Sequence, residues 1–163
     1  MQTTRTILIL VAAGGSAALL AGALMFEHLG GLPPCELCIW QRWPHLAAIA
    51  IGGLALVLPG ALPALAGAVA PAASGAIGVY HTGVERGWWE GPQACSGGGD
   101  IQGMSSGELL DQIMAAPVVR CDEVAWQMLG LSMASWNALA SFALAAVWLW
   151  AARRALSGRG TRR

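Results

Sequence analysis

The 163-residue sequence predicts an all-α membrane protein, a four-transmembrane-helix bundle with two outer loops, the second carrying a short amphipathic surface helix. The first observation behind this prediction is composition: 56% of the residues are hydrophobic and 11% are charged, which is too apolar for an ordinary soluble domain. The second is a succession of four apolar runs, and the third is the uneven placement of arginine along the chain. The length suits one domain, so we predict a single integral membrane domain over residues 1–163.

The first predicted span covers residues 7–26, which reaches the roughly 20 apolar residues that a transmembrane helix needs. A cleaved signal peptide is the alternative, because Arg5 is a basic residue before the run and residues 21–23 (Ala-Gly-Ala) resemble a cleavage site. The apolar run continues through Phe26, which favours a retained span. Either outcome leaves residue 27 outside.

The other three spans are predicted at residues 44–58, 62–80 and 133–151. The second is short, although residues 39–43 could extend it outward, and we expect Pro44 in its first helical turn. The third contains Pro71, which membrane helices tolerate when neighbours satisfy the freed backbone groups. The fourth has tryptophans near its ends that suit the membrane interfaces: Trp136, Trp148 and Trp150.

Arginine sets the predicted orientation. Five arginines crowd the C-terminus, at residues 153, 154, 159, 162 and 163, and Arg5 lies at the other end, so both termini should be cytoplasmic. The loops at residues 27–43 and 81–132 are then outside. The chain has no lysine and no basic tract, so nothing in it indicates nucleic-acid binding.

All four cysteines fall in the two outer loops: Cys35, Cys38, Cys95 and Cys121. An oxidising exterior favours disulfides, so two purely structural bridges are one interpretation. A zinc site is disfavoured, because Cys95 and Cys121 lie much farther apart than typical ligand pairs and oxidation removes thiolates; we predict no metal.

The pair Cys35-x-x-Cys38 favours redox exchange over a structural bridge, because such a pair can open and close and its thiolates respond to local charge. Arg42 follows Cys38 by four residues and shares its face if the segment is helical. Its guanidinium would favour a Cys38 thiolate and could bind an electron-rich ligand. The alternative for Arg42 is an anchor to lipid head groups.

The second pair has different surroundings. Cys95 precedes a flexible stretch at residues 96–99 (Ser-Gly-Gly-Gly), which suits a cysteine that must reach a partner. Residues 105–108 (Ser-Ser-Gly-Glu) form a capping-box pattern, and apolar residues then recur at helical spacing: Leu109, Leu110, Ile113 and Met114. We expect a short amphipathic helix on the membrane surface, or else packed against the bundle.

Over nearly the whole chain these features resemble the disulfide bond formation protein B (DsbB) family. The matching residues are Pro34, Cys35, Cys38, Trp40 and Arg42, then Tyr80 and His81, Cys95, Cys121, residues 126–133 and Trp136. The resemblance implies a multi-pass protein of the bacterial inner membrane, with both cysteine loops periplasmic. It also implies a protein dithiol:quinone oxidoreductase that reoxidises a periplasmic DsbA-like thioredoxin-fold oxidase and reduces a membrane quinone, ubiquinone or menaquinone.

Residue roles follow from the same resemblance. Cys95 would be attacked by the reduced partner, Cys121 would then engage Cys35, and Cys38 would face the quinone. Arg42 and His81 would form the quinone side, an interfacial histidine being the other interpretation of His81.

Several points stay open in the sequence. Glu36, inside the first pair, should raise the pKa of a neighbouring thiol. The resting disulfide pairing is open, since four cysteines allow three connectivities. A membrane scaffold with structural disulfides is the alternative function, and an enzyme of the vitamin K epoxide reductase type is disfavoured because its pair belongs nearer a late span.

Overall fold

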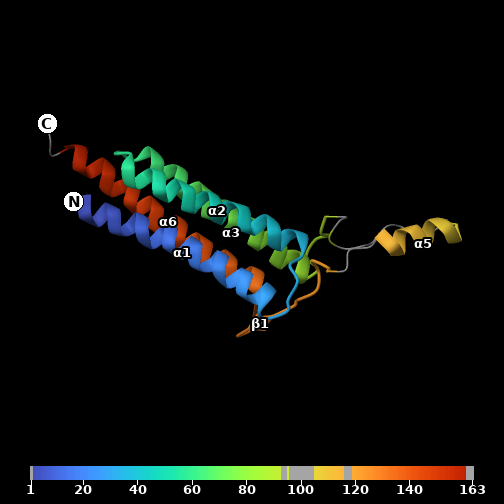
Figure 1. Cartoon of the computed structure of the whole chain (residues 1–163). Helices are drawn as coiled ribbons and strands as arrows, with labels where there is room; N and C mark the ends of the chain where they lie inside the picture. Colours follow the sequence, from blue (N-terminus) through green and yellow to red (C-terminus); the bar gives the residue numbers. More distant parts are fainter. Residues whose placement is uncertain (1, 93–94, 96–104, 116–118, 161–163) are drawn as a thin grey trace.

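A computed structural model describes residues 2–92, 95, 105–115 and 119–160 of the chain. Four long helices lie side by side: α1 (Gln2–His28), α2 (Glu36–Val57), α3 (Leu62–Glu85) and α6 (Met133–Gly160) (Figure 1). α6 packs against α1 and α3, and α2 packs against α1 and α3 as well. Both chain ends lie at one end of the bundle, and the loops that carry the cysteines lie at the other (Figure 1).

Within the described residues, three helices are long and apolar enough to cross a membrane: Thr3–His28, Leu62–Glu85 and Met133–Ser157. α2 is 22 residues long, but its N-terminal half contains Gln41, Arg42 and His45, which lower its mean hydropathy. A crossing by α2, and therefore the count of four spans, stays a prediction.

α2 begins at Glu36, so the expectation that Pro44 stands in its first turn is wrong. The helix starts earlier because Cys35 is its N-cap, with extended backbone angles and a sulfur that accepts a hydrogen bond from the Cys38 amide at 3.3 Å. Glu36 then occupies the first turn, where the helix dipole stabilises an acidic side chain. Pro44 lies in the helix interior, where its nitrogen carries no hydrogen and therefore donates no backbone hydrogen bond.

Small residues bring the helices into close contact at the end opposite the cysteines. The ring of Trp148 is fully buried there and faces Gly67 of α3. A Cβ at Gly67 would lie 2.6 Å from this ring, so the packing requires glycine. Trp148 was expected at a membrane interface, and its place in the core corrects that expectation, whereas Trp150 is exposed.

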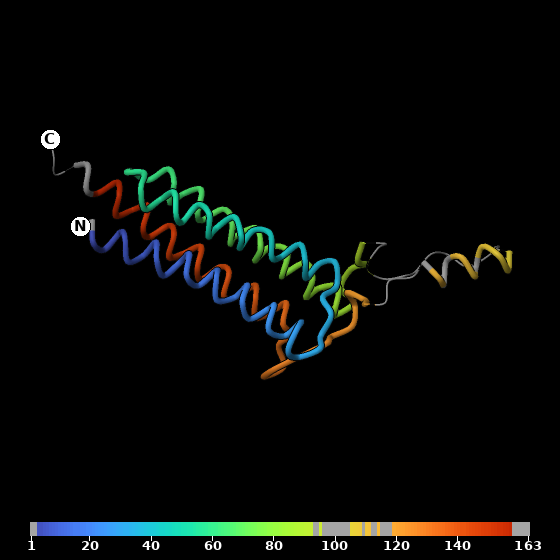
Figure 2. Tube along the Cα trace, viewed as in Figure 1, coloured from blue at the N-terminus to red at the C-terminus, as the bar shows by residue number. Residues whose placement is uncertain are grey.

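The loop between α3 and α6 contains a helix and a small hairpin. Helix α5 (Ser106–Ala115) has the predicted capping box, since Ser105 and Glu108 exchange hydrogen bonds through the Ser105 amide and hydroxyl. Figures 1 and 2 show α5 beyond the cysteine end of the bundle. Its location on a membrane surface stays a prediction. Strands β1 (Gln127–Met128) and β2 (Leu131–Ser132) form the hairpin that leads into α6.

Candidate functional site

The first cysteine pair lies at the N-terminus of α2, outside the segment predicted to span the membrane. The sulfur atoms of Cys35 and Cys38 are 2.9 Å apart, and both cysteines are free. Cys35 is buried, while Cys38 is half-buried. The helix thus holds both sulfurs within reach of forming one bond.

The two thiols differ in acidity. The pKa of Cys38 is lowered, chiefly by the hydrogen bond from the Cys35 thiol and further by its backbone hydrogen bond and the positive charge of Arg42, while burial opposes the shift. The pKa of Cys35 is raised well above its usual value by its hydrogen bond to Cys38 and by burial. Cys38 is therefore the more acidic thiol of the pair.

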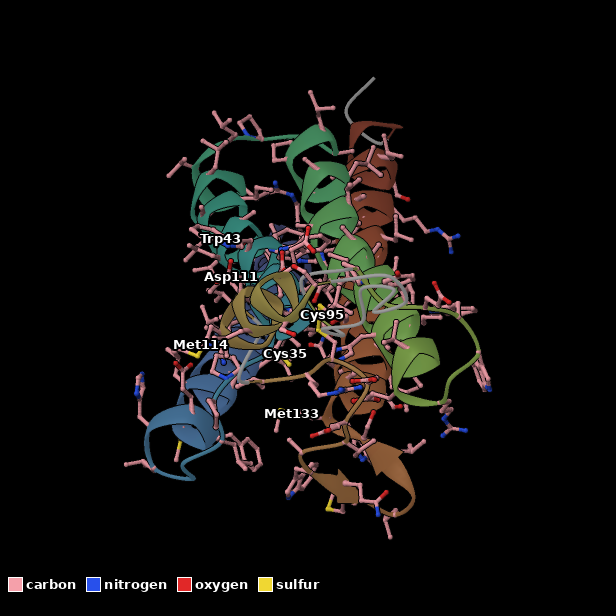
Figure 3. All side chains as sticks on the ribbon, turned by 90° about the vertical axis from the view of Figure 1, so that its right-hand side faces the viewer. Cys35, Trp43, Cys95, Asp111, Met114 and Met133 are labelled. Atoms are coloured by element: carbon pink, nitrogen blue, oxygen red, sulfur yellow. A yellow bond between two sulfur atoms is a disulfide. The ribbon has the colours of Figure 1, made fainter. Side chains whose placement is uncertain are left out.

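The second pair is a disulfide between Cys95 and Cys121, and both residues are fully buried. The Cys121 amide donates a hydrogen bond to the Cys95 carbonyl at 3.0 Å. Both cysteines pack with Cys35, Leu37 and Val84 in one apolar cluster. The two cysteine-bearing loops, far apart in sequence, therefore meet at the end of the bundle that faces the viewer in Figure 3, where Cys35 and Cys95 are labelled.

His81 lies at the junction of the two pairs. It projects from α3, is 3% exposed, and its Nε2 is 3.6 Å from the Cys35 sulfur. The sulfurs of Cys35 and Cys121 and a ring nitrogen of His81 all lie within 4.8 Å of one another. In the state shown, the Cys121 sulfur is bonded to Cys95, so these three residues could hold a soft metal ion only after that disulfide opens. The prediction of no metal stays a prediction.

Arg42 forms an ion pair with Glu27 of α1, with 2.5 Å between Arg42 Nη1 and Glu27 Oε2. The side chains are 17% and 25% exposed, respectively, so the pair is largely sheltered from solvent. Its guanidinium is therefore held between α1 and α2 close to Cys38, which argues against a simple anchor to lipid head groups.

A cavity of about 400 Å³ opens beside these groups. Most of its lining is apolar, from α1, α6 and the loops between the helices, and its polar lining residues include Cys38, Arg42 and His81. Phe26 and Trp136 supply aromatic surface. This size and lining match the usual site for a small, mainly apolar molecule with a few polar groups.

The sequence predictions missed the polar side chains buried between the helices. Gln41 Oε1 accepts a hydrogen bond from Asn137 Nδ2 at 2.8 Å, and Asn137 Oδ1 is 3.1 Å from His45 Nε2. His45 is 3% exposed inside the bundle. The Glu85 side chain, 6% exposed at the end of α3, accepts a hydrogen bond from Ser132 and lies 3.9 Å from His81. For His45 and Asn137 the available signal was a polar residue within a predicted apolar span, which is typical of a functional interior. Gln41 and Glu85 lie outside the predicted spans and gave no such signal.

Taken together, the apolar helices and the two cysteine pairs in contact define a helical, multi-pass membrane protein built for thiol–disulfide chemistry. Comparison with known proteins identifies the family: the sequence model described as "Disulfide bond formation protein DsbB" matches residues 4–151. The chain belongs to this family, and its role is in disulfide bond formation.

Relatives of the chain span most of its length. It is 33% identical to the disulfide bond formation protein B of Stutzerimonas stutzeri over 152 residues, covering 88% of this chain and 91% of the relative. It is 32% identical to the protein of the same name from Verminephrobacter eiseniae, covering 99% of this chain and 90% of the relative. A Rickettsia prowazekii protein, "Uncharacterized protein RP370", is 29% identical over 128 residues, covering 77% of this chain and 74% of that one. No solved structure matches the chain.

Proposed function

We propose that this protein is a protein dithiol:quinone oxidoreductase of the bacterial inner membrane, with both termini cytoplasmic and both cysteine loops periplasmic. It takes two electrons and two protons from a periplasmic DsbA-like dithiol and delivers them to ubiquinone or menaquinone, leaving the partner oxidised and the quinone as quinol. The observation that carries this proposal is the contact between a disulfide, Cys95–Cys121, and a redox pair, Cys35–Cys38, beside an apolar cavity.

On the partner side, a thiolate of the reduced partner attacks Cys95, which breaks Cys95–Cys121 and leaves a thiolate on Cys121. Cys121 then attacks Cys35 of an oxidised first pair, forming Cys35–Cys121 and releasing the Cys38 thiolate. The second partner thiol displaces Cys95 from the mixed disulfide, so the partner leaves oxidised. Cys95 finally attacks Cys121, which restores Cys95–Cys121 and leaves Cys35 and Cys38 reduced.

On the membrane side, the reduced pair returns to a disulfide as its two electrons and two protons pass to the quinone. Cys38 suits the role of electron donor because its pKa is lowered and it lines the cavity. Arg42 lines the same cavity and would stabilise negative charge on the Cys38 sulfur or on the reduced ring. His81 also lines it, so the predicted quinone-side role of His81 stays part of this proposal.

The alternative is a membrane scaffold whose cysteines are structural. The free pair at 2.9 Å, with unequal acidities, favours the enzyme, because a structural bridge needs neither.

The test is turnover of purified protein in detergent with a reduced thioredoxin-fold partner and a short-chain quinone. We expect one quinone reduced per partner oxidised, and no quinone reduction by the Cys38→Ser variant. Quinone reduction by Cys38→Ser at the parent rate would overturn the mechanism. Absence of turnover by the parent protein with either quinone would favour the scaffold.

A further inference from the structure

A chain of buried hydrogen bonds determines which nitrogen of His81 carries a proton. The chain starts at Gln41, whose Nε2 lies 3.0 Å from the backbone carbonyl oxygen of Leu37. A carbonyl oxygen can only accept, so the amide nitrogen of Gln41 must face it. The second N–H of the same amide then points to Nδ1 of His81, 3.0 Å away.

The other end of the Gln41 side chain supports the same orientation. Ser74 donates its hydroxyl proton to the Gln41 backbone carbonyl at 2.9 Å, so its oxygen is free to accept from Asn137 Nδ2 at 3.1 Å. The Asn137 amide nitrogen therefore also donates to Gln41 Oε1 at 2.8 Å. Two backbone carbonyls thus fix the donors and acceptors of the whole chain.

Because Nδ1 of His81 accepts a hydrogen bond, the neutral ring carries its proton on Nε2. This nitrogen faces two acceptors, the Cys35 sulfur at 3.6 Å and the Glu85 carboxylate at 3.9 Å. The Cys121 sulfur lies within the same 4.8 Å cluster. The N–H therefore faces the Cys35 sulfur, and the Cys121 sulfur with which Cys35 would exchange a disulfide lies in the same cluster.

We propose that Gln41 is a positioning residue that holds His81 with its proton on Nε2, so that this N–H stabilises the thiolates that form on Cys35 and Cys121 when the two pairs exchange. The inference rests on the proposed exchange function and gives His81 a place in it beyond the quinone side. The exchange itself is neutral in electrons: Cys121 attacks Cys35 and Cys38 leaves as a thiolate, and on return Cys95 attacks Cys121 and Cys35 leaves. His81 keeps its proton and lends a hydrogen bond at both steps.

The direct test needs neither partner nor quinone. In protein labelled with nitrogen-15 histidine, the His81 signals are assigned by their loss in His81→Ala, and their shifts report which nitrogen carries the proton. We expect a neutral ring protonated at Nε2 in the unaltered chain. A ring protonated at Nδ1 would overturn the proposal without any variant having to fold.

The second test measures Cys35 in a chain whose other three cysteines are serine, by alkylation with a small reagent as a function of pH. Titratable groups near the His81 ring in this chain are Glu85 on α3 and Cys35 itself. Gln41→Met keeps the side-chain length but loses both amide N–H donors. We expect it and His81→Ala each to slow alkylation below the thiol pKa about tenfold, the factor for one lost hydrogen bond to a charged group. The double variant should be no slower than His81→Ala, because Gln41 acts through His81.

The matched control is Ser141→Ala, which removes a buried hydroxyl at the His45 end of the same network. It should leave Cys35 alkylation unchanged. Normal alkylation in Gln41→Met with slow alkylation in His81→Ala would remove Gln41 from the proposal, and normal alkylation in both would refute it. If both tests succeed and the parent protein still fails to reduce quinone, the proposed overall function fails while the assignment of the His81 proton stands.

Discussion

The positive charge of Arg42, four residues after Cys38 on α2, is expected to hold down the pKa of the Cys38 thiol. The perturbation is Arg42→Met, which removes the charge and keeps most of the side-chain length. Side chains at this spacing on a helix are separated by about 6 Å. At an effective dielectric constant of about 20, two unit charges at that distance interact by about 2.8 kcal/mol, which corresponds to about 2 pKa units.

The carboxylate of Glu27 opposes this effect, since its oxygen lies 2.5 Å from the guanidinium and offsets part of its charge. We therefore expect Arg42→Met to raise the Cys38 pKa by about one unit, and alkylation below the pKa to slow about tenfold. Glu27→Gln should shift the Cys38 pKa in the opposite direction, because it frees the guanidinium charge.

The assay is the rate of Cys38 alkylation between pH 5 and 9, followed by peptide mass mapping, in reduced, quinone-free protein with Cys95→Ser and Cys121→Ser. These two substitutions remove the exchange partner and leave the Cys35–Cys38 hydrogen bond intact. An unchanged Cys38 pKa in Arg42→Met would refute the electrostatic reasoning. Shifts of the same sign in Arg42→Met and Glu27→Gln would indicate a packing effect instead of a charge effect.

Three further outcomes are expected. The Cys121→Ala variant should accumulate a mixed disulfide with the reduced partner through Cys95, visible on non-reducing gels; trapping through a cysteine of the first pair would reverse the roles of the two loops. A small soluble thiol should reduce the Cys95–Cys121 disulfide of the resting protein at a rate that reaches a plateau as the thiol concentration rises. Both cysteines are fully buried, so a local opening must come first. A rate that stays proportional to the thiol concentration would contradict this. Gly67→Ala should reduce the free energy of unfolding by about 1–3 kcal/mol through overpacking against Trp148, and so lower the midpoint of thermal unfolding. Gly53→Ala, where a Cβ meets open space, should leave the midpoint unchanged; equal midpoints for the two variants would refute the packing argument.

The sequence predicted the helical bundle because each apolar run reports its own length and composition. The start of a helix and the burial of a side chain were harder to predict where a residue type suits two different positions. Pro44 suits a first turn in isolation, yet a cysteine cap at Cys35 and an acidic residue at Glu36 start α2 earlier. Trp148 suits an interface by its position along the chain, yet Gly67 on another helix makes room for its ring in the core. Such outcomes depend on neighbours distant in sequence, and apolar periodicity carries no information about them.

In the candidate site, too, local features were predictable from the sequence and contacts between distant residues were not. Cys35, Cys38 and Arg42 were identifiable because their spacing is local, within two turns at the start of α2. The contact between the two cysteine pairs could not be identified from the sequence. It requires α3 to bring His81 to Cys35, and the loop between α3 and α6 to bring Cys121 to the same place. Gln41 gave no signal beyond being polar, and its contact with His81 depends on the packing of α2 against α3.

The burial of the Cys95–Cys121 disulfide constrains the order of events in the proposed relay. A bond with both sulfurs inside an apolar cluster is protected from adventitious thiols, but a partner must open the Cys95 side before it can attack. Cys121 already lies in the cluster with Cys35 and His81, so it needs little movement to continue the exchange. The requirement for mobility therefore falls on Cys95, whose neighbouring sequence is rich in glycine, while the groups that set thiol acidity stay fixed on α2 and α3. This separation would let one small protein combine a disulfide that only a specific partner can reach with a rigid electron-donating pair at the cavity.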